Sequence, residues 1–243
     1  EDGGTVTAQT WHYPGRTECM ACHNATAGFS LGFVSRQLNR DIAVNGAPLN
    51  QLSHFSAMGV FDPPVSNPAS LPKMAATDDA TASLELRFKS YLDANCAYCH
   101  MPGGVGRGTW DARFSTPMAR AGLINTPVTD DLGTPGAAII KPGSINESVL
   151  WRRIAEMGLY HMPPLATSVA NPAGIDLVKR FIQEATYVVA HPIFYNGSAF
   201  DGRDPGASSL DDRAIAPNKE VLLPGTRATL ANVTSYSRGV NGL

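Results

Sequence analysis

Apolar residues recur at helical spacing most clearly in the middle of the chain. One such face runs directly into a cysteine and consists of Leu84, Phe88, Tyr91 and Leu92. Their spacing of i, i+4, i+7 and i+8 places them on one side of a helix. Asp78 and Asp79 precede this face, and their charges complement the dipole at a helix start. The pattern therefore predicts a helix from about residue 78 to Cys96.

Two further helices are predicted downstream of this one. The stretch Ser144 to Glu147 has the capping-box pattern of a Ser followed three residues later by Glu. We expect a helix to begin there, to continue through Val149, Leu150, Ile154 and Met157, and to stop at Gly158. Asn171 followed by Pro172 predicts the N-cap and first residue of a last helix. The apolar face of that helix consists of Ile175, Val178, Phe181 and Ile182.

The remaining patterns divide the chain into three segments. In the first, residues 1–75, Asn50 is expected to cap a short helix over 51–58 that ends at Gly59, and the proline-rich stretch 62–72 is typical of a linker. The second segment, residues 76–190, contains the three helices described above. The third, residues 191–243, lacks cysteine and is rich in Asp, Gly and Ser before it becomes β-prone. Short strands are predicted there at 221–223 and 230–233.

Composition and charge exclude several classes of function. The chain of 243 residues has a net charge of -2 and a pI near 6.3, so no nucleic-acid partner is indicated. No apolar run approaches the roughly 18–20 residues that a transmembrane helix needs. No signal peptide is visible, and the start at Glu1 is typical of a mature product or an excised domain. The end at Leu243 is abrupt, which is typical of a piece of a longer chain.

All four cysteines fall in two copies of the pattern Cys-x-x-Cys-His, at Cys19, Cys22, His23 and at Cys96, Cys99, His100. This spacing is the attachment signal of c-type haem. The two thiols form thioethers with the porphyrin, and the histidine becomes the proximal iron ligand. With 6 His in the chain, chance would place His after both pairs only about once in 1600 cases. We therefore expect two covalently bound haem c groups.

Two other kinds of site also use paired cysteines. Four thiolates could form a tetrahedral zinc site, but this leaves both histidines unexplained. A redox-active dithiol usually occurs as one motif in a thioredoxin-like context rather than as two copies. Neither alternative accounts for the pattern as well as haem does.

The sixth ligand of the second iron is predicted to be Met162. This residue lies between two predicted helices and is followed by two prolines, which would stiffen the loop that presents its sulfur. Methionine opposite histidine is a common ligand pair of c-type haem. The neighbouring His161 is the local alternative.

The sixth ligand of the first iron has several candidates. His54 and Met58 are four residues apart and share a face of the predicted short helix, so either could reach an iron. We favour Met58 over His54, with Met74 and His12 as further candidates. An open iron remains an alternative, and it would permit exchange of small ligands.

The order of helix, haem motif, loop, helix, Met-Pro-Pro and terminal helix resembles a class I cytochrome c domain. In such domains the first and last helices pack through aromatic and small residues, which implies contact of Phe88 or Tyr91 with Phe181. The expected fold is therefore mainly α, with two tandem cytochrome c-like haem lobes, long loops and a small β-prone C-terminal extension. Each lobe would hold one motif.

From Tyr13 to Ile182 the chain also resembles a bacterial exported dihaem cytochrome module, of the kind associated with PQQ-dependent sugar-dehydrogenase-like proteins. The matching stretches are 13–18, 31–40, 50–52, 59–62, 90–95, 102–107, 142–144 and 162–165. The resemblance implies electron transfer with a dehydrogenase or another redox partner. Because bacterial haem c is attached after export, the motifs also imply a periplasmic or extracellular location.

The leading interpretation is an electron carrier rather than an enzyme, without catalytic residues, whose partner is a redox protein or further copies of itself. The first alternative is a dihaem peroxidase-like enzyme with an open first haem. The second is a haem-bearing structural module of an extracellular assembly, bound through the tail. A group of aspartates in that tail could bind calcium, although a solvated loop explains them better: Asp201, Asp204, Asp211 and Asp212.

Overall fold

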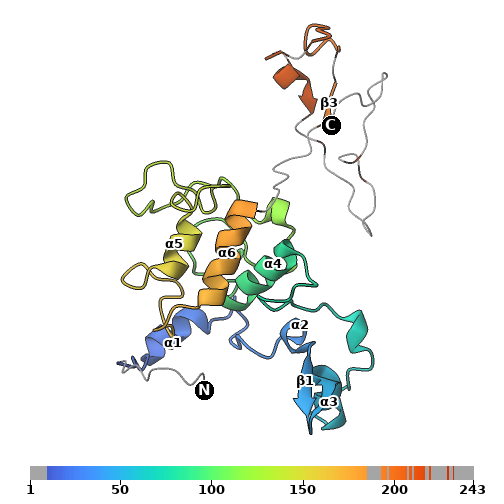
Figure 1. The fold of residues 1–243 in the computed structure, drawn as a ribbon, viewed down its shortest axis with the longest axis vertical. Coiled ribbons are helices and arrows are strands. Elements are labelled where there is room, and N and C mark those ends of the chain that lie inside the picture. Colours follow the sequence, from blue (N-terminus) through green and yellow to red (C-terminus); the bar gives the residue numbers. More distant parts are fainter. Residues whose placement is uncertain are drawn as a thin grey trace. The chain divides into compact units, whose positions relative to one another are not determined.

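The computed structural model describes residues 10–184, 193–195, 197–206, 208–209, 211–216, 219, 229 and 232. The chain forms two compact units, Glu1–Tyr187 and Val188–Leu243 (Figure 1). Both Cys-x-x-Cys-His motifs belong to the first unit. In the described ranges no helix is long and apolar enough to span a membrane.

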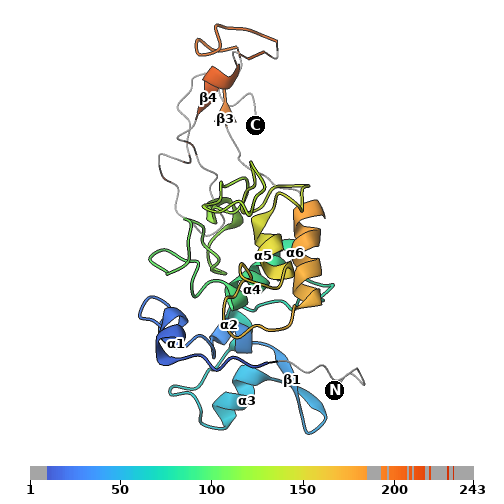
Figure 2. The same cartoon turned by 90° about the vertical axis from the view of Figure 1, so that its left-hand side faces the viewer.

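Three helices of the first unit surround its hydrophobic core: α4 (Leu84–Asn95), α5 (Val149–Ala155) and α6 (Pro172–Glu184). They lie side by side in both views (Figures 1 and 2). Phe88 and Phe181 are fully buried and stack with ring centroids 3.7 Å apart and an interplanar angle of 4°. The expected aromatic contact is therefore confirmed for Phe88. Both rings are removed from water, so their buried apolar area stabilises the core.

Two of the three expected helix starts in this region are wrong. Helix α4 begins at Leu84, where the Ser83 side chain accepts a hydrogen bond from the Leu86 amide, and not near Asp78. Helix α5 begins after Ser148 and not at Ser144. The Ser148 hydroxyl instead bonds the Lys141 amide and the Ser144 carbonyl, which closes a turn before the helix. The start of α6 is as predicted, since the Asn171 side chain accepts from the Gly174 amide.

The first part of the unit contains α1 (Arg16–Cys22), α2 (Ser35–Leu38) and α3 (Gln51–Ala57). Asn50 caps α3 through the amides of Leu52 and Ser53, so this expected cap is confirmed. An antiparallel hairpin was not expected and is formed by β1 (Asp41–Val44) and β2 (Ala47–Asn50). Asn45 and Gly46 connect the strands with φ values of 52° and 82°. Asn-Gly favours this two-residue turn, so the sequence contained a local signal for the hairpin.

The proline-rich stretch after α3 packs against the preceding chain. It contains a single 3-10 turn, η1 (Pro68–Ser70), and the Asn39 side-chain amide donates to the carbonyls of Pro68 and Leu71. Asn39 is buried, and its own side-chain oxygen accepts from Asn50. The stretch is therefore anchored at a buried polar side chain. A second 3-10 turn, η2 (Met118–Arg120), lies in the long loop between α4 and α5.

The expected fold class, a mainly α chain with two tandem cytochrome c-like lobes, is wrong. Only 30% of the described residues are helical and 9% lie in strands, which corresponds to a small mixed α/β chain. Long loops and a hairpin occupy the places where a second set of haem-lobe helices would be needed. The expectation failed because it extended the helical pattern of residues 84–182 to the rest of the chain.

The second unit contains a two-stranded antiparallel pair, β3 (Ile193–Phe194) with β4 (Ile215–Ala216), and the turn η3 (Asp211–Ala214). Asp201 is buried and accepts hydrogen bonds from the amides of Gly197 and Arg203. Its carboxylate therefore organises the loop between the strands. The strands predicted at 221–223 and 230–233 lie outside the described residues.

Candidate functional site

The first motif occupies the end of α1. Gly15 precedes this helix, and the Glu18 carboxylate accepts a 2.8 Å hydrogen bond from the Gly15 amide, which satisfies a free donor at the helix start. Cys19 and Cys22 are three residues apart in the helix and therefore lie on one face. The Cys19 sulfur is directed to the Pro14 carbonyl at 3.8 Å, and Cys22 is half-buried.

His23 ends α1, and its ring is oriented by the following loop. Its Nδ1 lies 2.6 Å from the Phe29 carbonyl oxygen. Because a carbonyl only accepts, Nδ1 carries the proton, and Nε2 is left with its lone pair for a metal. Asn24 shapes the loop: its side chain bonds the Ala21 carbonyl and the Ala27 amide, and its carbonyl accepts from the Phe29 amide.

Large apolar side chains lie exposed around the first motif. They are Trp11, Tyr13, Met20, Phe29 and Phe33, and the exposed fraction of Tyr13 and of Phe33 reaches 83%. His23 is exposed as well. Five large apolar side chains are thus exposed within 23 residues of the chain, and a contiguous group of this kind would be typical of an interaction surface.

The second motif follows α4 and lies against the core. Cys96 is the C-cap of this helix and packs against the core residues, and burial raises the pKa of its thiol to about 12. The His100 amide donates to the Cys96 carbonyl at 2.8 Å. The half-buried Tyr98 side chain also lies near the thiols; its phenol pKa is raised first by burial and then by Cys96, Cys22 and Cys99.

The His100 ring is held by close packing. It stacks on Trp110 with centroids 4.1 Å apart, and its Nδ1 is buried without a hydrogen-bond partner. Burial, followed by the charge of Arg153, lowers the pKa of His100 to about 4, so the imidazole is neutral at pH 7. A Cβ on Gly106 would lie 2.6 Å from Nδ1, so only glycine allows the loop this close to the ring. A neutral imidazole is the form that binds metals.

Arg153 connects the second motif to the Met162 loop. Its carbonyl accepts from the Met162 amide at 2.8 Å, and its guanidinium bonds the Tyr160 carbonyl and the Asp130 carboxylate. Arg153 therefore bonds to the Met162 loop and also lies close enough to His100 for its charge to lower the pKa of that ring. His161 is buried, and its Nδ1 lies 3.3 Å from the Pro163 carbonyl, whereas Met162 is half-buried. Sequence analysis missed both Arg153 and Trp110, which carry no motif.

The two motifs lie next to each other although they are far apart in sequence. Burial, followed by the nearby Cys22 thiol, raises the pKa of Cys99 to about 11. A Cβ on Gly103 would lie 3.8 Å from the Thr26 methyl group. Nearby, Arg36 forms a bidentate ion pair with the buried Asp93 of α4, at 2.8 Å and 3.0 Å. Local packing therefore joins the two motif segments.

The candidate distal ligands of the first iron are placed differently. Met58 is the C-cap of α3 and is 63% exposed, and His54 lies on the same helix. Figure 1 shows α1 and α3 well apart. The Met74 amide donates to the Arg36 carbonyl, and His12 lies 3.1 Å from the Glu18 carboxylate. The structure therefore does not place Met58 or His54 beside the first motif, and a sixth ligand there stays a prediction.

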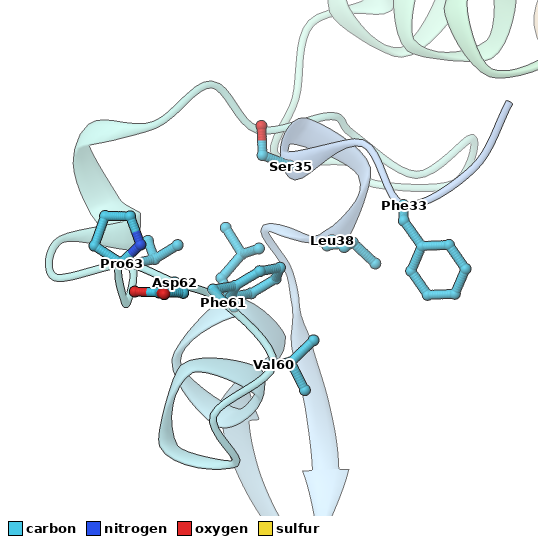
Figure 3. Close-up of a pocket in the computed structure, with 9 residues that line it drawn as sticks. Phe33, Ser35, Leu38, Val60, Phe61, Asp62 and Pro63 are labelled. Atoms are coloured by element: carbon cyan, nitrogen blue, oxygen red, sulfur yellow. The ribbon is translucent and has the colours of Figure 1, made fainter. Parts of the chain in front are cut away.

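A pocket of about 440 Å³ lies between α2, α3 and the chain that follows α3 (Figure 3). Its lining is mainly apolar and includes Phe33, Leu38, Val60 and Phe61, with Asp62 as the one charged residue. Neither histidine nor cysteine lines it.

The donor sets of the motifs fit covalently bound haem. All four thiols are free of disulfides, Nδ1 of His23 faces the Phe29 carbonyl, and the buried Nδ1 of His100 has no hydrogen-bond partner. In the described part of the chain no three His, Cys, Asp or Glu side chains are grouped as a metal-ion site. Each motif therefore offers two thiols and one imidazole, which is the set that thioether attachment with a proximal histidine uses.

Comparisons with known proteins add no relative: no family model, no curated protein and no solved structure matches this chain.

Proposed function

We propose that this chain is a dihaem c-type cytochrome that carries single electrons between exported redox partners. The observation that carries the proposal is the pair of Cys-x-x-Cys-His motifs in one compact unit, where the Cys22 thiol is close enough to Cys99 to raise its pKa. Groups attached at neighbouring thiols would be close to each other. Haem iron bound in this way changes between Fe(II) and Fe(III).

The side chains around each motif would have distinct roles. Cys19 and Cys22 would hold one haem and Cys96 and Cys99 the other, while His23 and His100 would bind the two irons. The Phe29 carbonyl orients the His23 ring, which raises the basicity of its free nitrogen. Trp110 and Gly106 orient the His100 ring. Arg153 holds the Met162 loop through two hydrogen bonds, which supports Met162 as the second distal ligand.

The proposed location is the periplasm or the cell exterior, because bacterial haem c is attached there. The proposed partner is a redox protein, either a dehydrogenase or an acceptor, or another copy of this chain. The exposed apolar group around the first motif supports contact there with haem or with a partner surface.

Three observations favour a second candidate, an enzyme with an open first haem. The ring of His23 is exposed, α3 with Met58 and His54 lies apart from α1, and His12 is paired with Glu18. An iron without a protein ligand in its sixth position could bind peroxide or another small molecule.

The test is expression with export and haem maturation, followed by intact mass measurement and haem staining on a denaturing gel. We expect a mass increase of two haem groups. The matched variants C19S/C22S and C96S/C99S should each retain one haem. Unmodified mass in the wild-type protein would overturn the proposal.

Spectra of the loaded protein separate the two candidates. Two low-spin haems, with the weak far-red methionine–iron band on one of them, would support the carrier. A high-spin signal that is lost in C19S/C22S and changes with cyanide would support the open first haem. The same signal lost in C96S/C99S would instead place the open iron at the second motif.

A further inference from the structure

Arg153, near the end of α5, connects two loops of the first unit. In the Met162 loop (residues 158–163), its backbone carbonyl accepts from the Met162 amide at 2.8 Å, and its Nη1 donates to the Tyr160 carbonyl at 3.1 Å. The guanidinium also lies over the Tyr160 ring, 5.9 Å from its centroid. Its Nη2 lies 3.1 Å from the carboxylate of Asp130, in the long loop between α4 and α5. One side chain therefore joins the Met162 loop to the loop that contains Asp130.

Helix α5 brings this connection to the second motif. Ile154, the residue after Arg153, is buried in the core cluster that also contains Ala97 of the motif. Trp110, which stacks on the His100 ring, belongs to the same cluster. The Met162 loop is thus anchored to a helix that shares its core with the second motif.

The Asp130 carboxylate is itself held in place. Its Oδ1 accepts from the Leu132 amide at 3.1 Å, while its Oδ2 pairs with Arg153. The Arg153 side chain is 21% exposed and that of Asp130 is 39% exposed, so water screens the pair only in part. Without the carboxylate the guanidinium would lose the partner that fixes its direction, and a long arginine side chain has many other rotamers. The hydrogen bond to the Tyr160 carbonyl depends on that direction.

The preceding residue, Arg152, attaches α5 to the same long loop independently. Its guanidinium bonds the Leu132 carbonyl and the Thr134 hydroxyl, and it also pairs with Glu156. These three partners lie outside residues 158–163. Removal of the other ion pair would therefore leave helix and loop attached, and its effect would be confined to the Met162 loop.

We propose that Asp130 is a positioning residue for the sixth ligand of the second iron: through Arg153 it holds the loop that presents the Met162 sulfur. The inference rests on the haem function proposed above. A loop that is already held in one arrangement has less conformational freedom to lose when its sulfur binds iron. The ion pair therefore favours the methionine-bound state.

Asp130→Asn is the test, and Asp131→Asn is its matched control. Both variants remove one negative charge from the same loop. Both also keep a side-chain oxygen for the turn amide that each aspartate binds, at Leu132 and at Gly133. Of these two described aspartates, only Asp130 pairs with Arg153. A difference between the variants thus reports the ion pair and not the charge of the loop.

The first readout needs no haem and uses the full chain as purified. Hydrogen exchange at the Met162 amide measures opening of the loop, because this amide donates to the Arg153 carbonyl. We expect exchange to be about three- to tenfold faster in Asp130→Asn than in the wild-type protein, as for loss of a partly buried charged hydrogen bond. Exchange in Asp131→Asn should be unchanged. Equal exchange in the two variants would overturn the proposal.

The second readout separates positioning from simple electrostatics in the loaded protein. Loss of a carboxylate near a haem favours the less positive, reduced iron and raises its potential. Loss of the methionine ligand lowers the potential. We therefore expect Asp130→Asn to weaken the far-red methionine–iron band and to lower the second potential, whereas Asp131→Asn keeps the band and does not lower the potential. A full band with a raised potential in Asp130→Asn would overturn the proposal.

The two readouts also separate this inference from the haem function. If the wild-type chain carries no haem at the second motif, the proposed function fails, and the exchange comparison still decides whether Asp130 holds the loop. If haem is attached but the methionine band persists in Met162→Leu, the haem function stands and the positioning role of Asp130 is overturned.

Discussion

The two motif regions differ in how much of their surroundings the fold supplies. The second motif follows a core helix, and its histidine is stacked on Trp110 and confined by Gly106. The first motif ends a seven-residue helix without buried residues, and its histidine is exposed. Identical local patterns thus lie in a packed and in an open environment.

This difference has chemical consequences for the proposed cofactors. Burial and a methionine ligand favour reduced iron and raise its reduction potential. An exposed site with an unassigned sixth ligand would have a lower potential and greater ligand exchange. The comparison therefore predicts two haems of unequal potential, with the second the higher. The proximity of the motifs would allow electrons to pass between them.

The largest loss of folding stability is expected when a buried aromatic ring is removed from the hydrophobic core next to the second motif. Phe181→Ala removes the ring that stacks on Phe88, and we expect it to lower the free energy of unfolding by about 3–5 kcal/mol. Denaturant unfolding of the haem-free chain measures this. The matched control is Phe33→Ala near the first motif, where 83% exposure predicts a change of about 0.5 kcal/mol or less. Equal losses in the two variants would contradict the contrast between packed and open regions.

The next effect tests whether the two regions fold as one unit. Arg36→Met leaves the buried Asp93 without its charge partner, although the Phe114 amide still donates to it. We expect a loss of about 3 kcal/mol in the free energy of unfolding, because an unpaired buried charge is costly. Limited proteolysis should also release the segment around the first motif more rapidly.

The control for this ion pair is Arg180→Met, which removes the exposed pair with Glu184 at the end of α6. It should leave both unfolding and proteolysis nearly unchanged, because exposed pairs contribute little. If Arg36→Met behaved in the same way, the first region would not depend on its contact with α4.

A smaller effect is expected from crowding His100. Gly106→Ala would place a methyl group 2.6 Å from the ring nitrogen, and we expect a loss of about 1–3 kcal/mol in the free energy of unfolding. In the loaded protein the second haem should be perturbed, as read from haem content after C19S/C22S is combined with this change. The first haem should be unchanged, as read after C96S/C99S is combined with it. Gly32→Ala is the control, since nothing lies near its added Cβ. Full second-haem content and unchanged stability would refute the confinement of His100.

The smallest effect on stability, and the most specific one, is expected at Met162. Met162→Leu keeps the volume in the loop but removes the sulfur, so folding should change little. The far-red methionine–iron band should disappear, and one reduction potential should fall by on the order of 0.1 V, within the range that axial ligands set. Redox titration with optical detection measures both. Met58→Leu is the matched comparison, and a band lost in that variant instead would assign the methionine ligand to the first iron.

Local patterns predicted those features that depend on residues close in sequence. The Asn50 and Asn171 caps are where their side chains indicated, because a cap needs only the next three amides. The same reasoning misplaced α5, because Ser148 uses its hydroxyl to close a turn with Lys141 and Ser144. The hairpin at Asn45–Gly46 was not predicted, although Asn-Gly is a local sequence signal for such a turn. The expected two-lobe fold was wrong because the helical pattern of residues 84–182 was assumed to hold for the first part of the chain as well.

By itself the sequence determined the chemistry available to the chain: four thiols, two adjacent histidines, and apolar faces at helical spacing that stack Phe88 on Phe181. Only the tertiary structure decided that Cys22 lies close enough to Cys99 to raise its pKa, that Trp110 stacks on His100, and that Asp93 binds Arg36. Helical periodicity relates residues a few positions apart, so it specifies which face of a helix is buried. It does not specify which other element covers that face. The partners across the unit follow from the packing of distant segments, and no spacing in the chain encodes them.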